Sequence, residues 1–462
     1  MDTRGEGGFT LIETILGLVV MTIMVTAITQ LFVDNLRVVT LGKARAIGLS
    51  LANEQMEYLR DLPYQSVATQ LGAIYPPGLI ADNQVVSRGG YTFNLKTEIT
   101  YVDDPYDGYA SCPCASGPAA GKPQDLNPAD YKKAQISVYL KSSGQLVDQL
   151  TTDLAGKAAE TASNTGVLSV KVIDANGQPV ANASVHILNT APNPDVDITT
   201  TTDNQGLVVI PNLPPDSKNE YQVTASLSGY STDATEADPA GTTTAVELNP
   251  NVLVQQITSL TLSIDRVSTM FVHVTDTSGA ALASKAIEIR GAKVLEKSGG
   301  NPSVPSKYKY DVTSTTDASG NINLNTMEWD GYSFIPPSGW YLVSAQPYQP
   351  VALAPNTSQT VNLVLSNSSS YVAIATMTPT SGQTGTASAS FTLTGSNFNG
   401  STTVKLRQSG QPDITASGLN VTGSTKLTGN FNLTGAATGA WDVVVTSSGN
   451  TVTQTGGFSV TP

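Results

Sequence analysis

The sequence predicts an α+β module, in which one long N-terminal helix lies on a small antiparallel sheet, followed by three all-β sandwich domains. Three observations lead to this fold class. A single apolar run stands near the N-terminus, and after it apolar residues mostly alternate with polar ones, as in half-buried strands. The later part of the chain is also rich in glycine, serine, threonine and asparagine, which separate short strands. At 462 residues, the chain is long enough for several cores.

The apolar run covers Phe9–Val33, which is long enough to cross a bilayer, since about 20 helical residues suffice. Glu13 is its only charged residue. A carboxylate at the centre of a membrane-spanning helix costs about 2.5 kcal/mol or more, so Glu13 is a candidate functional residue. The helix is expected to continue to Pro63, because an apolar stripe repeats beyond the run at helical spacing: Ala44, Ile47, Leu51, Tyr58 and Leu62.

Three strands are predicted after this helix. Apolar residues mostly alternate with polar ones in Tyr91–Tyr101 and in Ala134–Leu140, and a third strand is expected over Gln145–Leu154. These strands would form the small sheet under the helix. The α+β module is therefore expected to cover residues 9–157, with a membrane-spanning segment at 9–33.

The motif GFTLIE at Gly8–Glu13 resembles the leader of type IV prepilins, and the end of the predicted helix resembles minor pilins of the pilus-modification type. The resemblance implies that residues 1–8 are a leader, that a membrane peptidase cuts after Gly8, and that Phe9 becomes the N-methylated terminus. It also implies that the Glu13 carboxylate meets the α-ammonium of Phe9 on a neighbouring subunit. Two opposite charges about 4 Å apart attract by about 4 kcal/mol at an effective dielectric constant near 20. The alternative is an interfacial glutamate in a plain signal anchor.

Two consecutive segments carry the same turn and strand pattern. In residues 166–267, a turn at Asp174–Gly177 and the motif TTDNQG at Thr201–Gly206 separate alternating strands. In residues 268–366, Asp276–Gly279 and TTDASG at Thr315–Gly320 repeat them. Both segments resemble the carboxypeptidase regulatory-like domain, which implies two β-sandwiches. We interpret Asp-x-x-Gly as a turn rather than a metal ligand, because Asp closes an Asx-turn and Gly takes the left-handed position.

The last segment, residues 370–462, resembles an immunoglobulin-like domain of the IPT/TIG type through motifs such as FTLTGSNFNG and GAWDVVVTSSGN. Eight apolar residues are expected to fill its core. They are Phe391, Leu393, Phe398, Trp441, Val443, Val445, Phe458 and Val460.

Aromatic residues concentrate in one stretch of a chain that is only 6% aromatic. Exposed rings would form a platform for sugars or for a protein partner, whereas buried rings would simply be the core of the second repeat. The candidates for recognition are Trp329, Tyr332, Phe334, Trp340 and Tyr341.

A loop between the predicted strands carries two further candidates. Asp103, Asp104 and Asp107 offer oxygen ligands for calcium, although a solvated acidic turn is the favoured interpretation because the spacing matches no complete calcium loop. Cys112 and Cys114 could form a tight disulfide, remain free thiols, or bind a metal with unidentified partners.

The net charge of −13 and the pI of about 4.6 disfavour binding to nucleic acid. The sequence contains no recognisable catalytic arrangement or phosphate-binding motif, so we expect neither an enzyme nor a cofactor. The resemblance implies a minor type IV pilin-like subunit that displays its sandwiches for adhesion; the alternative is a pseudopilin of a type II secretion or DNA-uptake system. Its expected partners are other pilins, the prepilin peptidase, the cytoplasmic membrane and a glycan or protein ligand. It would be a single-pass membrane protein with an extracytoplasmic bulk, then part of a pilus or cell surface.

Overall fold

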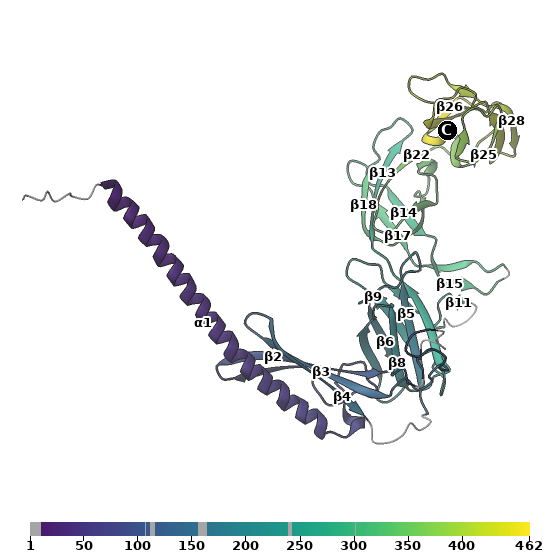
Figure 1. Cartoon of the computed structure of the whole chain (residues 1–462). Coiled ribbons are helices and arrows are strands. Elements are labelled where there is room, and N and C mark those ends of the chain that lie inside the picture. The colour runs from purple at the N-terminus through teal and green to yellow at the C-terminus, as the bar shows by residue number, and fades with distance from the viewer. Residues whose placement is uncertain (1–10, 107, 111–115, 156–163, 239–242, 301) are drawn as a thin grey trace, which may run out of the picture.

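The computed structural model describes residues 11–106, 108–110, 116–155, 164–238, 243–300 and 302–462, except for the side chain of Glu13. Within these residues, one long α-helix is followed by a small antiparallel sheet and then by a succession of further β-sheets (Figure 1). This arrangement confirms the fold class expected from the sequence. Four hydrophobic cores follow one another along the described chain.

Helix α1 (Leu11–Asp61) has two halves in different surroundings. The first half, residues 11–39, stands clear of the rest of the protein (Figure 1). Its apolar side chains are exposed. The second half packs on the sheet, and Gly48 allows a close approach, since a Cβ there would lie 2.9 Å from Val147 Cγ2. Tyr58 was predicted on the buried face of the helix but is 48% exposed. The buried face is formed instead by Ala44, Leu51, Ala52, Met56 and Leu59.

The sheet under α1 has the order β1-β2-β3-β4, and all its neighbouring strands are antiparallel. Its strands are β1 (Asn83–Arg88), β2 (Tyr91–Val102), β3 (Tyr131–Leu140) and β4 (Gln145–Ala155). Strands β2, β3 and β4 coincide closely with the predicted ones, whereas β1 was not predicted. The single-turn 3-10 helix η1 (Tyr64–Ser66) follows α1.

The first sandwich (residues 166–263) is built from two sheets, β10-β9-β6-β7 and β12-β5-β8. Its inner faces are lined by alternating apolar residues of both sheets, as a sandwich requires. Its strands are β5 (Gly166–Ile173), β6 (Ser184–Asn189), β7 (Val196–Thr201), β8 (Leu207–Leu213), β9 (Gln222–Ser226), β10 (Asp233–Ala234) and β12 (Ile257–Ser263).

The second sandwich (residues 268–366) has the sheets β18-β13-β22-β20 and β17-β14-β19-β21. A separate small sheet, β11-β15-β16, joins a strand that precedes β12 to a hairpin of the second sandwich. The strands are β11 (Thr243–Ala245), β13 (Ser268–Asp276), β14 (Ala286–Gly291), β15 (Val294–Ser298), β16 (Pro305–Tyr308), β17 (Asp311–Thr315), β18 (Asn321–Met327), β19 (Asp330–Ile335), β20 (Tyr341–Gln346), β21 (Val351–Leu353) and β22 (Ser358–Ser366).

The third sandwich (residues 373–461) has the sheets β23-β25-β29-β28 and β24-β31-β30-β26-β27. All eight residues predicted for its core are buried. Its strands are β23 (Ala373–Thr378), β24 (Ser381–Gln383), β25 (Ala389–Ser396), β26 (Thr403–Arg407), β27 (Ile414–Thr415), β28 (Ser417–Thr422), β29 (Lys426–Phe431), β30 (Gly439–Ser447) and β31 (Asn450–Thr461).

The Asp-x-x-Gly motifs are turns, as their residue pattern predicts. In the first, Asp174 Oδ1 accepts hydrogen bonds from the backbone N–H groups of Asn176 and Gln178, each 2.8 Å long. Gly177 has a φ of +77°, a region that favours glycine. The motifs that begin at Asp203, Asp276 and Asp317 repeat this geometry.

Candidate functional site

The residues expected to direct processing and assembly lie at the start of the chain. Gly8 and Phe9 fall outside the described residues, and of Glu13 the structure gives only the backbone, which is helical. The adjoining part of α1 is long and apolar enough to cross a membrane by its length and composition. None of this apolar stretch is buried against the rest of the protein, so its side chains remain available to a membrane or to other helices.

The five aromatic candidates do not form one platform. Tyr332 and Phe334 are only 1% and 2% exposed, so both rings belong to the core of the second repeat and are not available for recognition. Trp340 packs partly against the same core, while Tyr341 is 46% exposed. Trp329 is half-buried at the edge of a cavity between the first two sandwiches.

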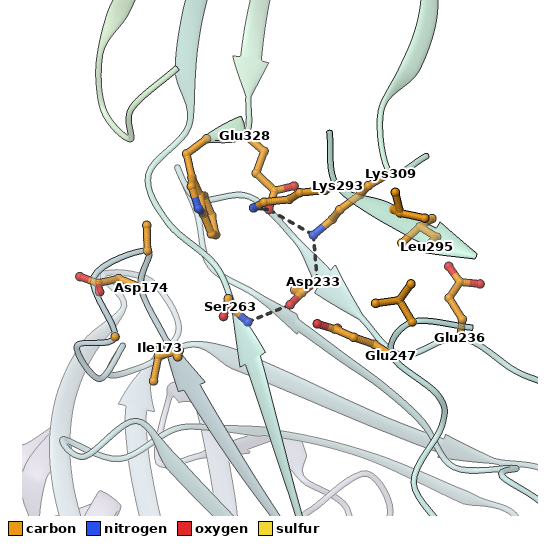
Figure 2. A pocket seen from close by; sticks show the side chains of 15 residues that line it. Ile173, Asp174, Asp233, Glu236, Glu247, Ser263, Lys293, Leu295, Lys309 and Glu328 are labelled. Carbon is orange, nitrogen blue, oxygen red and sulfur yellow. Dashed lines mark hydrogen bonds and ion pairs between the residues drawn. The ribbon is translucent and has the colours of Figure 1, made fainter. Parts of the chain in front are cut away.

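This junction cavity has a volume of about 460 Å³. One wall comes from the first sandwich and the segment before β12, including Asp174, Asp233 and Glu247. The other comes from the second sandwich, including Lys309 and Glu328 (Figure 2). The cavity therefore has charged groups of both signs on its walls.

Lys309 connects the two sandwiches across this cavity. Its Nζ lies 2.8 Å from Asp233 Oδ1 and 3.1 Å from Glu328 Oε1 (Figure 2). The second oxygen of Asp233 accepts a 2.8 Å hydrogen bond from the Ser263 N–H, and Lys293 Nζ lies 2.7 Å from the same Glu328 oxygen. Burial disfavours the charged ammonium, yet the two carboxylates raise the pKa of Lys309 above its ordinary value. The ammonium therefore stays charged and holds both carboxylates.

Two more groups of this cavity are notable. The Trp329 ring lies beneath the Lys293 ammonium, with 3.3 Å between Nζ and the ring centroid, a cation–π contact. The Glu247 carboxylate makes no hydrogen bond or ion pair within the described part of the chain. Glu247 is exposed as a residue, but partial desolvation at the cavity wall and the nearby Asp233 charge raise its pKa. The walls of the cavity thus carry an aromatic ring, a carboxylate without an ion-pair partner in the described part of the chain, and a network of ion pairs.

The acidic loop brings together a different set of carboxylates from the predicted one. Ligand oxygens of Asp103, Asp125 and Asp130 lie within 4.8 Å of one another, and such oxygens could hold a hard cation. Asp104 instead donates its backbone N–H to Asp130 Oδ2, 2.5 Å away. Asp107, Cys112 and Cys114 lie outside the described residues.

Sequence reasoning missed the residues that join the modules. Tyr75 precedes β1, yet its ring belongs to the core of the first sandwich, and its hydroxyl donates to Pro194 O at 2.8 Å. No local pattern distinguishes this tyrosine. Lys307 and Lys309 did carry a signal, because two lysines stand two positions apart at the end of β16 in a chain of net charge −13. Lys307 pairs with Glu236 of the first sandwich at 3.3 Å.

Residues 167–251, most of the first sandwich, match a known family. They match the carboxypeptidase regulatory-like domain. This agrees with the resemblance drawn for residues 166–267, while the match covers a minor part of the whole chain. A search of curated proteins gives no match.

Several solved structures show partial similarity. The TIE protein of Bacillus anthracis is 13% identical, with 70% of this chain and 56% of that chain covered and a TM-score of 0.19. The shaft pilin SpaA of Lactobacillus rhamnosus GG is 13% identical over 44% of this chain and 98% of that one, with a TM-score of 0.16. A Streptococcal ancillary pilin is 13% identical over 50% and 75%, with a TM-score of 0.21. Similarities of this size support no conclusion about function.

Proposed function

We propose that this chain is a minor type IV pilin-like subunit, held in the cytoplasmic membrane and then in a fibre by α1, with its sandwiches displayed outside. The observation that supports this most is the division of α1. Residues 11–33 are exposed and predominantly apolar, whereas residues from Leu41 onward pack on a sheet of the same chain. Such a half-covered helix needs a bilayer or neighbouring helices around its first half.

In this proposal, a prepilin peptidase removes residues 1–8 and Phe9 becomes the methylated N-terminus. Glu13 then pairs with the α-ammonium of Phe9 on an adjacent subunit. Either charge alone would be costly among apolar helices, whereas the pair offsets much of that cost. The motif GFTLIE supports this assignment.

The displayed sandwiches would make contact with a surface, through a glycan or a protein ligand, without catalysing a reaction. Of the aromatic candidates, Trp329, Trp340 and Tyr341 retain exposure that a ligand could use. Tyr332 and Phe334 are assigned to the core instead.

Processing is tested by Gly8→Trp, because a peptidase pocket shaped for glycine should reject bulk. We expect an uncleaved chain in the membrane fraction, detected by mass spectrometry of the N-terminus. Normal amounts of mature chain that begins at Phe9 would contradict the assignment.

Assembly is tested by Glu13→Val, which removes the charge and keeps the helix apolar. Membrane insertion and cleavage should persist, while the amount of the subunit in sheared fibres should fall about tenfold or more, equivalent to 1.4 kcal/mol. Thr14→Val is the matched control, since it makes the neighbouring position apolar and leaves the carboxylate intact. Equal incorporation of both variants would exclude a recruiting role for Glu13.

A further inference from the structure

The first sandwich begins and ends with strands that lie side by side. The chain enters through β5 and leaves through β12, and these two strands pair in parallel over seven positions, from Val167↔Ile257 to Ile173↔Ser263. Further bonds extend the ladder at both ends. The Val167 N–H donates to Gln256 O at 3.0 Å, and the Ile264 N–H donates to Ile173 O at 3.0 Å.

The second sandwich repeats this arrangement. Its first strand β13 and its last strand β22 pair in parallel over eight positions, from Thr269↔Ser358 to Asp276↔Leu365. The inward side chains of both strands are buried, so water has little access to one face of the ladder. In each of the two sandwiches, the first and the last strand are therefore joined to each other by a parallel ladder.

A parallel pair at the two ends of a module responds to tension in a particular way. Pulling the start of the first strand and the end of the last strand slides one along the other, so all bonds of the ladder bear the load together. In an antiparallel pair pulled at adjacent ends, the bonds break one after another. Each bond contributes only about 1 kcal/mol net, so simultaneous loading is what makes a ladder resistant to force.

We propose that the first two sandwiches form a load-bearing tether, in which the pairs β5–β12 and β13–β22 carry tension in shear between a contact on the third sandwich and α1. The proposed function supplies the source of this tension. The resistance to force depends only on strand order and register. The proposed function and the proposed resistance can therefore be disproved independently of each other.

The junction between the two sandwiches is consistent with this role. Residues 264–267 connect β12 to β13 and are bonded on both sides: the Val267 N–H donates to Gly229 O at 3.0 Å, and Arg266 O accepts from the Asn356 N–H at 3.3 Å. Strand β11 pairs with β15 across the junction, beside the ion pair of Lys309 and Asp233. The linker that passes tension from one ladder to the next is therefore held by hydrogen bonds to both sandwiches.

The third sandwich is joined to the second by buried contacts. Gln454 Nε2 donates to Ala345 O at 2.6 Å, and the Tyr348 hydroxyl donates to Gly457 O at 3.2 Å. Its own parallel pair, β24 with β31, has only three positions. We therefore expect it to yield before the other two.

The test is single-molecule force spectroscopy on the full chain in detergent micelles, with handles attached enzymatically at two places. One handle is placed in the exposed turn at residues 141–144 and the other after Pro462, which loads all three sandwiches in series. In a second geometry, the other handle is inserted between Ser217 and Lys218, both exposed. Since Gly166 pairs with Leu213 in antiparallel β5 and β8, this pull unzips the first sandwich from that end.

In the first geometry, we expect the first two sandwiches to open only at high force. In the second geometry, the first sandwich should open at a force several-fold lower. Equal forces in the two geometries would overturn the proposal. The comparison requires no substitution, so it does not depend on a variant that fails to fold.

A pair of proline variants on the edge strand β12 tests the ladder directly. The hydrogen bonds at the two ends of the ladder fix the alternation of a parallel pair, so the Thr258 N–H is directed towards β5 and the Ser259 N–H away from it. Thr258→Pro should lower the opening force in the first geometry, and Ser259→Pro should leave it near the wild-type value. Thr258→Val controls for the hydroxyl, which donates to Asn251 O at 2.6 Å. A force unchanged by Thr258→Pro, or lowered equally by both prolines, would contradict shear loading.

Discussion

Replacing Lys309 by methionine should weaken the junction between the first two sandwiches. The change keeps an unbranched side chain but removes the cation that lies between Asp233 and Glu328, whose side chains are only 9% and 15% exposed. Removing one partner of a buried ion pair costs about 3–5 kcal/mol. Because Lys309 itself is 20% exposed, and because Lys293 still neutralises Glu328, we expect a smaller loss of about 2 kcal/mol in the free energy of unfolding.

The assay is urea unfolding of the full chain in detergent, followed by tryptophan fluorescence, since Trp329 lies at this junction. The double variant Asp233→Asn with Lys309→Met should recover part of the loss, because it also removes the Asp233 charge that the single variant leaves without a cation. Lys405→Met is the control: its partner Asp413 lies 2.6 Å away in the third sandwich, but the pair is 35% and 31% exposed, so less than about 1 kcal/mol should be lost.

Lys309 would have no special role at the junction if Lys309→Met cost no more than Lys405→Met, or if the double variant were less stable than the single one. The pH dependence gives a further check. The pKa of Lys309 is raised in the folded protein, so its contribution is fully present below its ordinary pKa and is lost as the pH rises through the raised value. The difference between wild type and Lys309→Met should therefore shrink at strongly alkaline pH.

Three further predictions concern the modules and their junctions. Tyr75→Ala should destabilise the first sandwich by about 3 kcal/mol in urea unfolding, while Tyr75→Phe, which loses only the bond to Pro194 O, should cost about 1 kcal/mol. Glu247 has a raised pKa, so its protonated form stabilises the fold below its ordinary pKa and this is lost as the pH rises through the raised value. Glu247→Gln should therefore raise the Tm by about 1–2 °C at pH 7 and not at pH 4; the effect is small because Glu247 as a residue is exposed to solvent, which screens its charge. A fragment of residues 166–462 should be soluble without detergent and rich in β structure by circular dichroism; aggregation would show that the sandwiches depend on the helix-bearing module, for example through Tyr75.

The elements that the sequence predicts well are those determined locally. The Asp-x-x-Gly turns need only an aspartate side chain and a glycine with positive φ, and both can be identified from four residues. Strand alternation in the third sandwich likewise predicted its core, since a buried face requires apolar residues at every second position. Prediction of the helix face was less accurate: Tyr58 fits the spacing but lies beside the buried stripe.

The contacts between modules could not be predicted from the sequence, because each depends on residues far apart in the chain. Tyr75 enters the core of a sandwich that begins some ninety residues later, and β11 pairs with a hairpin of the next sandwich. The acidic loop shows the same limit, since Asp103 meets Asp125 and Asp130 rather than its near neighbours. Parallel pairing of first and last strands is also a property of topology and leaves no mark in local composition. The roles of Gly8, Phe9 and Glu13 stay predictions.

Display of the sandwiches on a fibre is tested most directly by imaging. A small tag after Pro462 would be labelled on intact cells and located by electron microscopy together with the filaments. We predict label on extracellular filaments, on their shafts or at their tips, and its loss from them in the Glu13→Val strain. Label confined to the cell envelope, with filaments present and unlabelled, would contradict the account and favour a pseudopilin.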